Sequence, residues 1–377
     1  MKQRESGGLE KIGDLIRKTR PAIAIAPKET KNADKLSRPA RPEFENGQLN
    51  LFQTFLYNHD DERDQFSNAI DLWDNVPRYS ISRQAMTKQR INGRFLEKHQ
   101  AKFQYKGRTY TRVIYPARVT DLDGIDRDYY ASANEELVED ALRKLAIEQQ
   151  AGYFDKPNNR SGVVFTLYAL RQELSKRGHS RSYQQLVLAL NILSHCIIDI
   201  IPDGAGESLA TSPCLPSLVA VSRARLRDDP KAKWAVQFHP FVTGSIDKVT
   251  YRQFNYHLMM SHSTQLARWL HKQLVLKYTF AGTMNPFETR FSTIKRDSGL
   301  LDNYGRTPDA IDALEEALGE LKKRDVLFSC TRTNIAGPRG KLLDASFKLL
   351  PSLDFIRDTK AASKRLSLST QTAPQDR

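Results

Sequence analysis

The side chains best suited to chemistry in this sequence lie together at one predicted helix start. The stretch RSYQQ places Arg181, Ser182, Tyr183, Gln184 and Gln185 in consecutive positions. Arg and Gln can form bidentate hydrogen bonds with guanine and adenine edges, and Ser and Tyr can bind phosphate oxygens. We therefore expect these five residues to contact DNA. The alternative is a solvated helix face with no partner.

Further cations flank this stretch. Arg171, Lys176 and Arg177 lie on the preceding predicted helix and at its end, and Arg223 and Arg225 follow on a later strand. The two arginines of the strand are two residues apart, so they share one face of it. We expect all five of these residues to contact DNA as well.

A second group of candidate contacts lies in the last third of the chain. TNIAGPRGKLLDASFKLLPS, residues 333–352, is expected to form two strands with Arg339 and Lys341 at the tip between them. Glycines at the tip permit close backbone approach, and the cations can neutralise phosphates. An ordinary exposed hairpin is the alternative. The other candidates of this group are Arg290, Lys295, Arg296, Arg306 and Thr307.

Composition narrows the class of partner. The 377 residues carry a formal net charge of +14, which favours a polyanion, either nucleic acid or an anionic membrane. The most apolar run, LVLALNILSHCIIDII, contains Asn191, Ser194, His195 and Asp199 and is too short and polar to span a bilayer. The N-terminus lacks the apolar region of a signal peptide. We expect a soluble cytoplasmic protein with no membrane partner.

The sequence gives little support to catalysis or metal binding. It contains no G-x-x-x-x-G-K-[ST] phosphate loop, no G-x-S-x-G nucleophile motif and no His-x-His pair. The run DLDGIDRD, residues 121–128, has four aspartates, but their spacing is not that of an EF-hand loop. We expect a solvated turn there, and no catalytic residue, cofactor or metal in the protein.

The elements around the first group follow a definite order. A helix from Ser132 to about residue 150 begins with a capping box to Glu135. A short strand, GVVFTL, precedes a helix that Gly178 should end, and the next helix begins at Ser182 with a second capping box. The remaining elements are a strand at 197–201, a loop, and a returning strand at 216–227.

The same order recurs downstream. Residues 261–278 read as a helix, and NPFETRFSTIKR, residues 285–296, reads as a second helix with Asn285 as N-cap and Pro286 at its first position. A third helix should start with Thr307 as N-cap and bury Ile311, Leu314, Leu318 and Leu321. Two strands, 326–335 and 342–350, complete the set.

Three helices followed by a two-stranded hairpin predict a winged-helix module, in which the third helix can enter the major groove and the hairpin can lie along phosphates. The predicted fold class is therefore α+β, with two tandem winged-helix modules. The expected organisation is a disordered basic arm at 1–43, a mixed segment at 44–130, module 1 at 131–233, module 2 at 234–357 and a disordered polar tail at 358–377.

Two parts of this organisation leave alternatives open. In the mixed segment, FQYKGRTYTRVIYPARV predicts a strand pair that turns at Lys106 and Gly107, but the role of the segment is undetermined. The third helix of module 2 carries acidic residues that phosphates would repel. That module could dock through the start of this helix, or through its second helix, or it could bind a protein. The acidic residues are Asp309, Asp312, Glu315, Glu316 and Glu320.

At this point the pattern resembles a known family. Two winged-helix modules in a basic protein resemble the iteron-binding replication initiator (Rep) proteins of theta-replicating plasmids. The stretches that carry the resemblance are YYASANEELVEDALRKLA, FTLYALRQELSKRGHSRSYQQLVLALNIL and RWLHKQLVLKYTFAG.

The resemblance implies several functions. They are binding of double-stranded DNA at repeated origin sites, opening of adjacent AT-rich DNA, recruitment of the host initiator and replicative helicase, dimer formation and repression of the protein's own gene. A winged-helix transcriptional regulator without a replication role is the alternative. A scaffold that binds proteins through its winged helices is a third interpretation.

Overall fold

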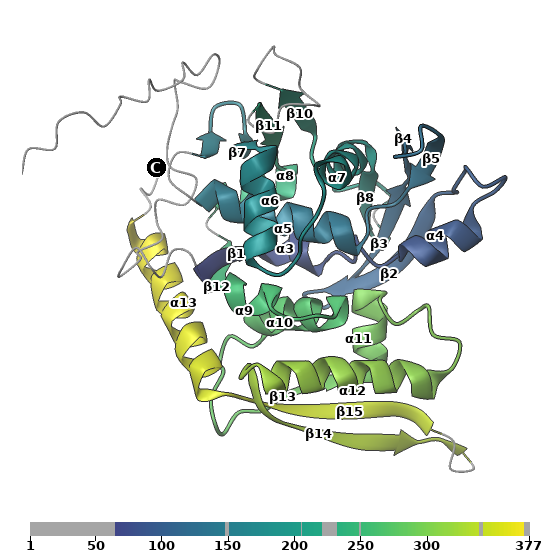
Figure 1. Ribbon diagram of the computed structural model, residues 1–377. Coiled ribbons are helices and arrows are strands. Elements are labelled where there is room, and N and C mark those ends of the chain that lie inside the picture. The colour runs from purple at the N-terminus through teal and green to yellow at the C-terminus, as the bar shows by residue number, and fades with distance from the viewer. Residues whose placement is uncertain are drawn as a thin grey trace, which may run out of the picture. The chain divides into compact units, whose positions relative to one another are not determined.

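The computed structural model describes residues 65–147, 151–204, 206–220, 232–248, 250–338 and 342–372 (Figure 1). The chain divides into two compact units, residues 1–42 and 43–377, and all described residues belong to the second. The predicted basic arm at 1–43 therefore lies outside the described residues.

The first half of the described chain combines short strands with helices (Figure 1). Its elements in chain order are β1 (Phe66–Ile70), α3 (Asp71–Asn75), α4 (Arg83–Gln89), β2 (His99–Tyr105), β3 (Arg108–Tyr115), β4 (Ala117–Thr120), β5 (Asp126–Tyr129), α5 (Ala133–Ile147), β6 (Gly152–Asp155), β7 (Arg160–Thr166), α6 (Leu167–Lys176) and α7 (Tyr183–His195).

The second half contains the longest helices and strands. Its elements are β8 (Ile197–Pro202), β9 (Ala210–Pro213), β10 (Ser217–Ala220), β11 (Lys233–Gln237), α8 (Pro240–Asp247), β12 (Tyr251–Asn255), α9 (Tyr256–Met260), α10 (Gln265–Lys277), β13 (Phe287–Arg290), α11 (Phe291–Ser298), α12 (Thr307–Lys323), β14 (Leu327–Ala336), β15 (Leu342–Pro351) and α13 (Leu353–Thr372).

The helices of the first predicted module begin and end where the sequence indicates. The main-chain N–H of Ser132 donates to the Glu135 carboxylate at the start of α5, over 2.9 Å. At α7 both halves of the capping box between Ser182 and Gln185 are present. Gly178, at φ 85°, follows α6 in the left-handed conformation that favours glycine. The predictions for α7 and Gly178 are confirmed, whereas at α5 the structure has only the bond from the Ser132 N–H to Glu135, and Ser132 Oγ donates to the same carboxylate.

The strand partners around α7 differ in part from expectation. The β2–β3 pair turning at Lys106 and Gly107 is confirmed, and both residues have positive φ, as a two-residue hairpin turn requires. However, β8 lies between β3 and β9 in a four-stranded sheet, β2-β3-β8-β9. The returning strand predicted over 216–227 is present in its described part as β10, but its expected place beside β8 is wrong, because β9 pairs with β8. In the described part of 216–227, β10 pairs with β11 in another sheet, β10-β11-β7-β6.

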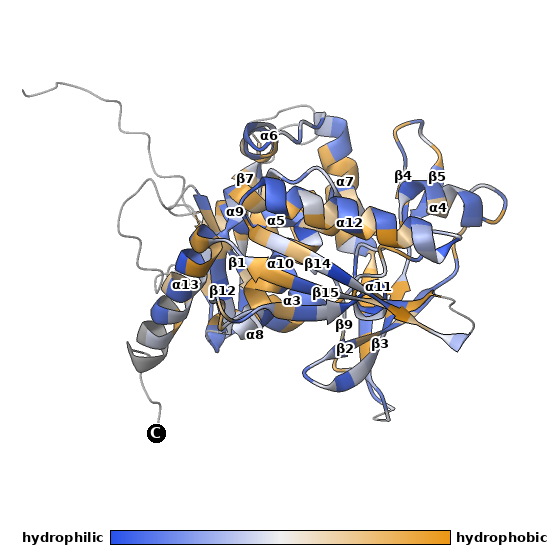
Figure 2. Cartoon of the chain, turned by 90° about the horizontal axis from the view of Figure 1, so that it is seen from below, coloured by the Kyte–Doolittle hydropathy of each residue, from blue (hydrophilic) through white to orange (hydrophobic). Residues whose placement is uncertain are grey.

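Module 2 shows the winged-helix order more compactly. Helix α10 is followed by β13, α11, α12, β14 and β15, and the three strands form one sheet in the order β13-β15-β14. The predicted hairpin of 326–350 is confirmed as β14 and β15. The stripe of Ile311, Leu314, Leu318 and Leu321 on α12 is buried as expected. In Figure 2, α12 runs alongside this hairpin and shows hydrophilic residues along its length.

Two helix boundaries in module 2 need correction. The predicted helix over 285–296 starts only at Phe291, because Phe287–Arg290 form β13 and pair with β15. Phe287 and Thr289 favour strands, and pairing with β15 outweighs the local signal of Asn285 and Pro286. Helix α12 begins one residue earlier than predicted, with Arg306 as its N-cap.

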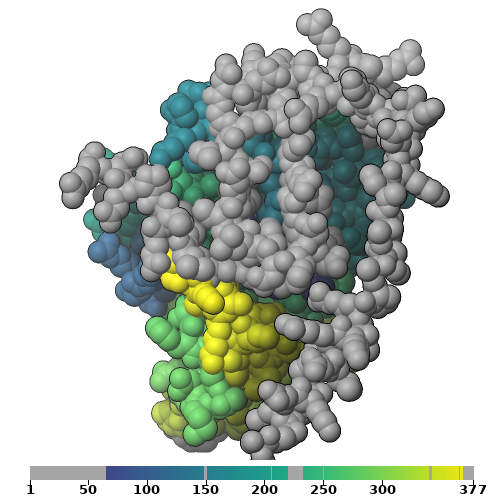
Figure 3. All heavy atoms as spheres, turned by 90° about the vertical axis from the view of Figure 1, so that its left-hand side faces the viewer, coloured from purple at the N-terminus to yellow at the C-terminus, as the bar shows by residue number. Residues whose placement is uncertain are grey.

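The C-terminal segment also differs from expectation. The disordered tail predicted from residue 358 is wrong over residues 358–372, which continue α13. The reason is packing that composition does not reveal, because Thr359 and Ala362 are buried and Arg252 of β12 donates to Ser363 Oγ over 2.9 Å. Figure 3 shows α13 in yellow at the surface.

Strands of the N-terminal segment pair with strands of both later segments. β3 pairs with β8, and β1 pairs with β12. The predicted boundaries at residues 130 and 233 remain predictions, but these pairings mean that residues 66–115 complete sheets of the later segments. The fold is α+β, with two copies of the winged-helix order of elements.

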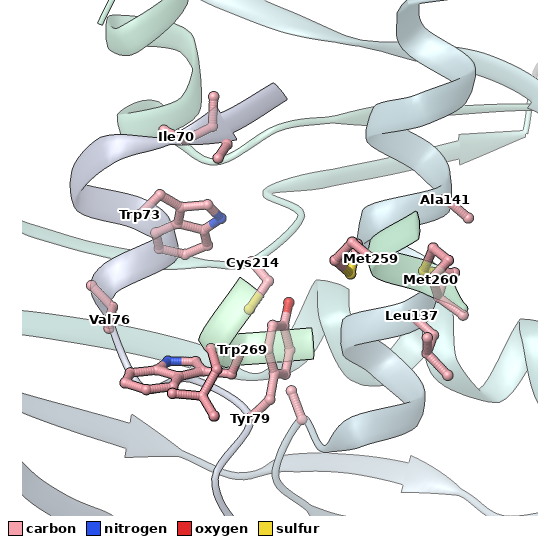
Figure 4. Close-up of a cluster of buried hydrophobic side chains, with 14 of the residues drawn as sticks. Ile70, Trp73, Val76, Tyr79, Leu137, Ala141, Cys214, Met259, Met260 and Trp269 are labelled. Atoms are coloured by element: carbon pink, nitrogen blue, oxygen red, sulfur yellow. The ribbon is translucent and has the colours of Figure 1, made fainter. Parts of the chain in front are cut away.

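A mixed apolar and charged core joins these parts. Trp73, Tyr79, Cys214, Met259 and Trp269 lie in one buried cluster (Figure 4). Beside it, buried ion pairs connect α3, α5 and α10. They are Arg143 with Asp74 (2.8 Å) and with Asp140 (2.7 Å), Lys272 with Asp140 (2.6 Å) and Arg78 with Glu139 (3.0 Å).

Candidate nucleic-acid interface

The two glutamines at the start of α7 differ in whether their side-chain amides already form hydrogen bonds within the protein. Ser182 Oγ accepts from the main-chain N–H of Gln185 (3.2 Å), and Gln185 Oε1 accepts from the main-chain N–H of Ser182 (3.0 Å). The Gln185 amide oxygen is therefore engaged in the cap. The Gln184 side chain is exposed and makes no hydrogen bond to another described residue. A bidentate contact to adenine needs both the oxygen and the nitrogen of the amide, so Gln184 is the better candidate.

Arg171 is held beside this helix start. Its Nε donates to the main-chain oxygen of Arg181 over 3.1 Å, and its guanidinium lies 5.0 Å from the ring centroid of Tyr183. Arg171 is exposed, so its outer nitrogens face solvent while these two contacts fix the side chain. This geometry suits a phosphate contact next to the residues that can meet base edges.

Arg181 differs from Arg171, because much of its side chain is bonded to neighbouring residues of the protein. It is partly buried, its Nε donates to Asn134 Oδ1 over 2.5 Å, and its Nη1 donates to the main-chain oxygen of Ser180 over 2.8 Å. Burial, followed by the nearby Arg268, lowers the pKa of Arg181. A partly buried cation beside another cation is stabilised by a nearby anion, and DNA would supply one.

The structure does not bring Arg177 to this surface. Arg177 is buried, with its Nε 2.9 Å from Glu173 Oε1 and its Nη1 2.6 Å from His257 Nδ1. It therefore joins α6 to α9 inside the molecule. Lys176 is exposed in the last turn of α6. Arg223, Arg225, Arg339 and Lys341 lie outside the described residues.

The module 2 candidates lie on three elements. Arg290 is exposed at the end of β13, while Lys295 and Arg296 are partly buried on α11. Arg296 is paired with its neighbour Asp297 over 2.8 Å. Arg306 is also paired, with Asp309 over 2.8 Å, although 79% of its side chain is exposed. Thr307 is exposed at the start of α12. If Arg306 and Arg296 contact DNA, each guanidinium group has to bind a phosphate in addition to its aspartate, or in place of it.

The acidic residues of α12 are largely engaged within the module. Glu320 accepts hydrogen bonds from Ser263 Oγ (2.6 Å) and Thr264 Oγ1 (2.9 Å) before α10. Partial burial alone would raise the pKa of Glu320, but these bonds lower it to about 2. Glu315 pairs with Arg332 over 3.3 Å. Asp309 pairs with Arg306, so three of the five acidic residues have partners in the same module. This weakens the argument that this face evolved to bind a basic protein.

Sequence reasoning missed the side chains that position the α7 surface. Asn134 and Glu135 on α5 connect Arg181 to Arg83 of α4, which pairs with Glu135 over 2.7 Å. The capping box pointed to Glu135, but only as a helix signal. No local pattern relates Arg83 to Glu135, which lies 52 residues later.

The described residues contain no group of three or more His, Cys, Asp and Glu side chains arranged to hold a metal ion. In the DLDGIDRD turn, Arg127 pairs with Asp121 (3.0 Å) and Asp123 (2.6 Å), so the aspartates there neutralise a side chain of the same turn. In the part of the chain that the structure describes, no helix combines the length and apolar character needed to cross a membrane.

Comparisons with known proteins give structural similarity alone. No protein-family model matches the chain, and no curated protein matches its sequence. Two crystal structures of domains 2 and 3 of RctB are similar to this chain. The first has 10% sequence identity and a TM-score of 0.45, and the match covers 75% of this chain and 96% of that one. The second has 8% identity and a TM-score of 0.40, and the match covers 71% of this chain and 94% of that one.

The Pi initiator protein in complex with iteron DNA is also similar, at 13% identity and TM-score 0.39 over 64% of this chain and 98% of that one. The resemblance to iteron-binding initiators predicted from the sequence thus has a counterpart among solved structures. At these identities and TM-scores, the similarities carry no weight for the activity of this chain, which has to be argued from its own residues.

Proposed function

We propose that this chain binds double-stranded DNA in a sequence-specific manner through α7 and initiates replication at repeated origin sites. The observation that supports this most is the start of α7. There Gln184 is exposed with its amide unengaged, and Arg171 is fixed next to it with its outer nitrogens in solvent. A side chain that can bind a base edge and one that can bind phosphate thus lie side by side at the start of the third helix of the predicted winged-helix module.

The proposed mechanism uses both modules. Module 1 reads a major-groove segment through Gln184, and module 2 docks on a neighbouring segment through Arg290, Thr307 and the hairpin tip with Arg339 and Lys341. Linking two weak contacts raises affinity through effective concentration. Copies on adjacent repeats could bend the duplex and favour opening at flexible AT-rich steps.

The further roles in this proposal come from the resemblance to Rep proteins. They are recruitment of the host initiator and replicative helicase, dimer formation and repression of the protein's own gene. The chain would act in the cytoplasm, by binding and without catalysis.

Footprinting of the purified protein on its own upstream DNA, at two salt concentrations, tests the proposal. We expect several regularly spaced protected segments beside a tract that becomes reactive to single-strand probes. One protected palindrome without opening would favour the transcriptional regulator instead. The absence of protection at either salt concentration would exclude both and leave the protein-binding scaffold.

A further inference from the structure

The N-terminal segment contributes a basic surface directly beside α7. Arg83 Nη2 donates to Glu135 Oε1 over 2.7 Å, and Asn134 Nδ2 donates to the same oxygen over 3.2 Å. Asn134 Oδ1 in turn accepts from Arg181 Nε over 2.5 Å. One continuous chain of hydrogen bonds therefore connects the first residue of α4 to the residue before the N-cap of α7.

This connection is anchored in the interior. Glu135 is fully buried and also accepts from the main-chain N–H and the Oγ of Ser132. Strand β4, which follows the β2–β3 pair, packs against α7, and Figures 1 and 2 both show β4 and β5 next to α7 with α4 beside them. The position of α4 relative to α7 is thus fixed by side-chain bonds and by packing.

We define the α4 lobe as residues 82–98, which include α4 and the turn after it. The lobe contains five cations and one acid. Two cations have structural roles, because the guanidiniums of Arg83 and Arg90 lie 4.4 Å and 4.5 Å from the Tyr129 ring centroid. The other three, Lys88, Arg94 and Lys98, are exposed and form no ion pair with the other described residues.

The turn of the lobe that contains Arg94 has a defined backbone. Ile91 and Phe95 form a bridge, and Asn92 and Gly93 between them have φ of 52° and 69°. Such a turn needs residues that tolerate positive φ, and Asn followed by Gly is the preferred pair. The Arg118 guanidinium lies 4.7 Å from the Phe95 ring centroid, which steadies the base of the turn.

We propose that the α4 lobe binds the phosphate backbone of the DNA that flanks the segment read by α7, with Lys88 and Arg94 as the contacting residues. This inference rests on the proposed DNA binding by α7. Its own support is charge complementarity and continuity, since exposed cations without ion pairs, Lys88 and Arg94 among them, lie on a lobe that is tied by hydrogen bonds to the start of α7. It assigns a role to the segment that the sequence left undetermined.

A protein partner is the other occupant to consider, because Ile91 and Phe95 are 50% and 41% exposed. The charge balance of the lobe favours DNA, and Phe95 is already covered on one side by Arg118. Phosphate contacts predict a specific signature. Each phosphate neutralised by a cation changes the slope of log affinity against log salt by about 0.9.

The test measures binding of wild type and of the double variant Lys88→Ala, Arg94→Ala to the footprinted site, between about 50 and about 200 mM salt. We expect the variant to show a slope shallower by about two and an affinity at least about tenfold lower at the lower salt. The DNA duplex is then shortened at one end and, in a separate experiment, at the other. We expect the variant and wild type to bind one of these two shortened duplexes with equal affinity, because it lacks the DNA that the lobe contacts.

Two controls separate this inference from its alternatives. The double variant Lys322→Ala, Lys323→Ala removes the same charge at the far end of α12 and should keep the wild-type slope. Lys88→Arg with Arg94→Lys should keep it as well. If the wild type binds its site and the lobe variant has an unchanged slope, the lobe does not contact phosphate and DNA binding by α7 still stands. If the wild type does not bind DNA, both proposals fail together.

Discussion

At the scale of single residues, identical side chains in adjacent positions have different roles. Gln184 and Gln185 are equivalent in the sequence, and both were expected to read bases. The capping box engages the amide oxygen of Gln185, while the Gln184 amide is exposed. The same distinction separates Arg171, which faces solvent, from Arg177, which is buried against Glu173 and His257.

Gln184→Ala should therefore weaken binding to the specific site by about 1–3 kcal/mol and relax base preference at one position. Gln185→Ala should instead lower the free energy of unfolding by about 0.5–1.5 kcal/mol, the typical net effect of losing one hydrogen bond, here the one that the Ser182 N–H donates to its side chain. Binding to a set of single-base variants of the site, together with urea unfolding, distinguishes the two effects. An equal loss on specific and random DNA for Gln184→Ala would show that it contacts the backbone.

At the scale of elements, helices were more predictable than strand partners. Caps and buried stripes are local, so Ser182, Gly178 and the stripe of α12 locate helices from nearby residues alone. Strand pairing is not local. Ile198 and Ile200 of β8 are fully buried, but nothing near them indicates that β3, more than 80 residues earlier, is their neighbour. For the same reason, the sequence near Phe287 and Thr289 indicates a helix, whereas in the structure both residues pair with β15.

In the candidate site, too, the local part could be predicted from the sequence and the connections between distant segments could not. Residues 181–185 are contiguous, and the sequence placed them at a helix start correctly. The connection from Arg181 through Asn134 and Glu135 to Arg83 crosses three segments, so no window of sequence contains it. The exposure of Lys88 and Arg94 also depends on how α4 packs, which composition does not determine.

The bond between α12 and α10 gives a pH-dependent prediction for one element. Glu320 has a pKa of about 2 in the folded protein, against an ordinary value of 4.5, because Ser263 and Thr264 donate to its carboxylate. A lowered pKa in the folded state means that the carboxylate stabilises the fold above about pH 4.5 and loses this effect as the pH falls towards 2. Glu320→Gln should thus lower the unfolding temperature at pH 7.

Thermal unfolding of the variant and of wild type across this range checks the prediction. The difference between the two unfolding temperatures should shrink as the pH falls below about 4.5. Glu316→Gln, on the exposed side of the same helix, is the matched control and should unfold like wild type at pH 7. A difference for Glu320→Gln that is constant from pH 7 to pH 3 would mean that its carboxylate charge does not hold α10.

At the scale of the whole molecule, buried charges join the first helices of the two modules. Lys272 of α10 lies 2.6 Å from Asp140 and 3.4 Å from Glu136 of α5. Burial would lower the pKa of Lys272, but these two carboxylates raise it, so the lysine stays charged in the interior. Asp74, held by Arg143, adds the N-terminal segment to the same network. Two modules coupled in this way should unfold together.

Lys272→Met should therefore destabilise the whole described unit, because it leaves Glu136 and Asp140 buried with fewer partners. We expect a loss of about 3 kcal/mol, the lower end for a broken buried pair, since Arg143 still holds Asp140. Urea unfolding followed by fluorescence and by circular dichroism should show one shifted transition with both probes. Lys323→Met, at the exposed end of α12, should change stability by less than about 0.5 kcal/mol. Two separate transitions, or a variant as stable as wild type, would mean that this network does not couple the modules.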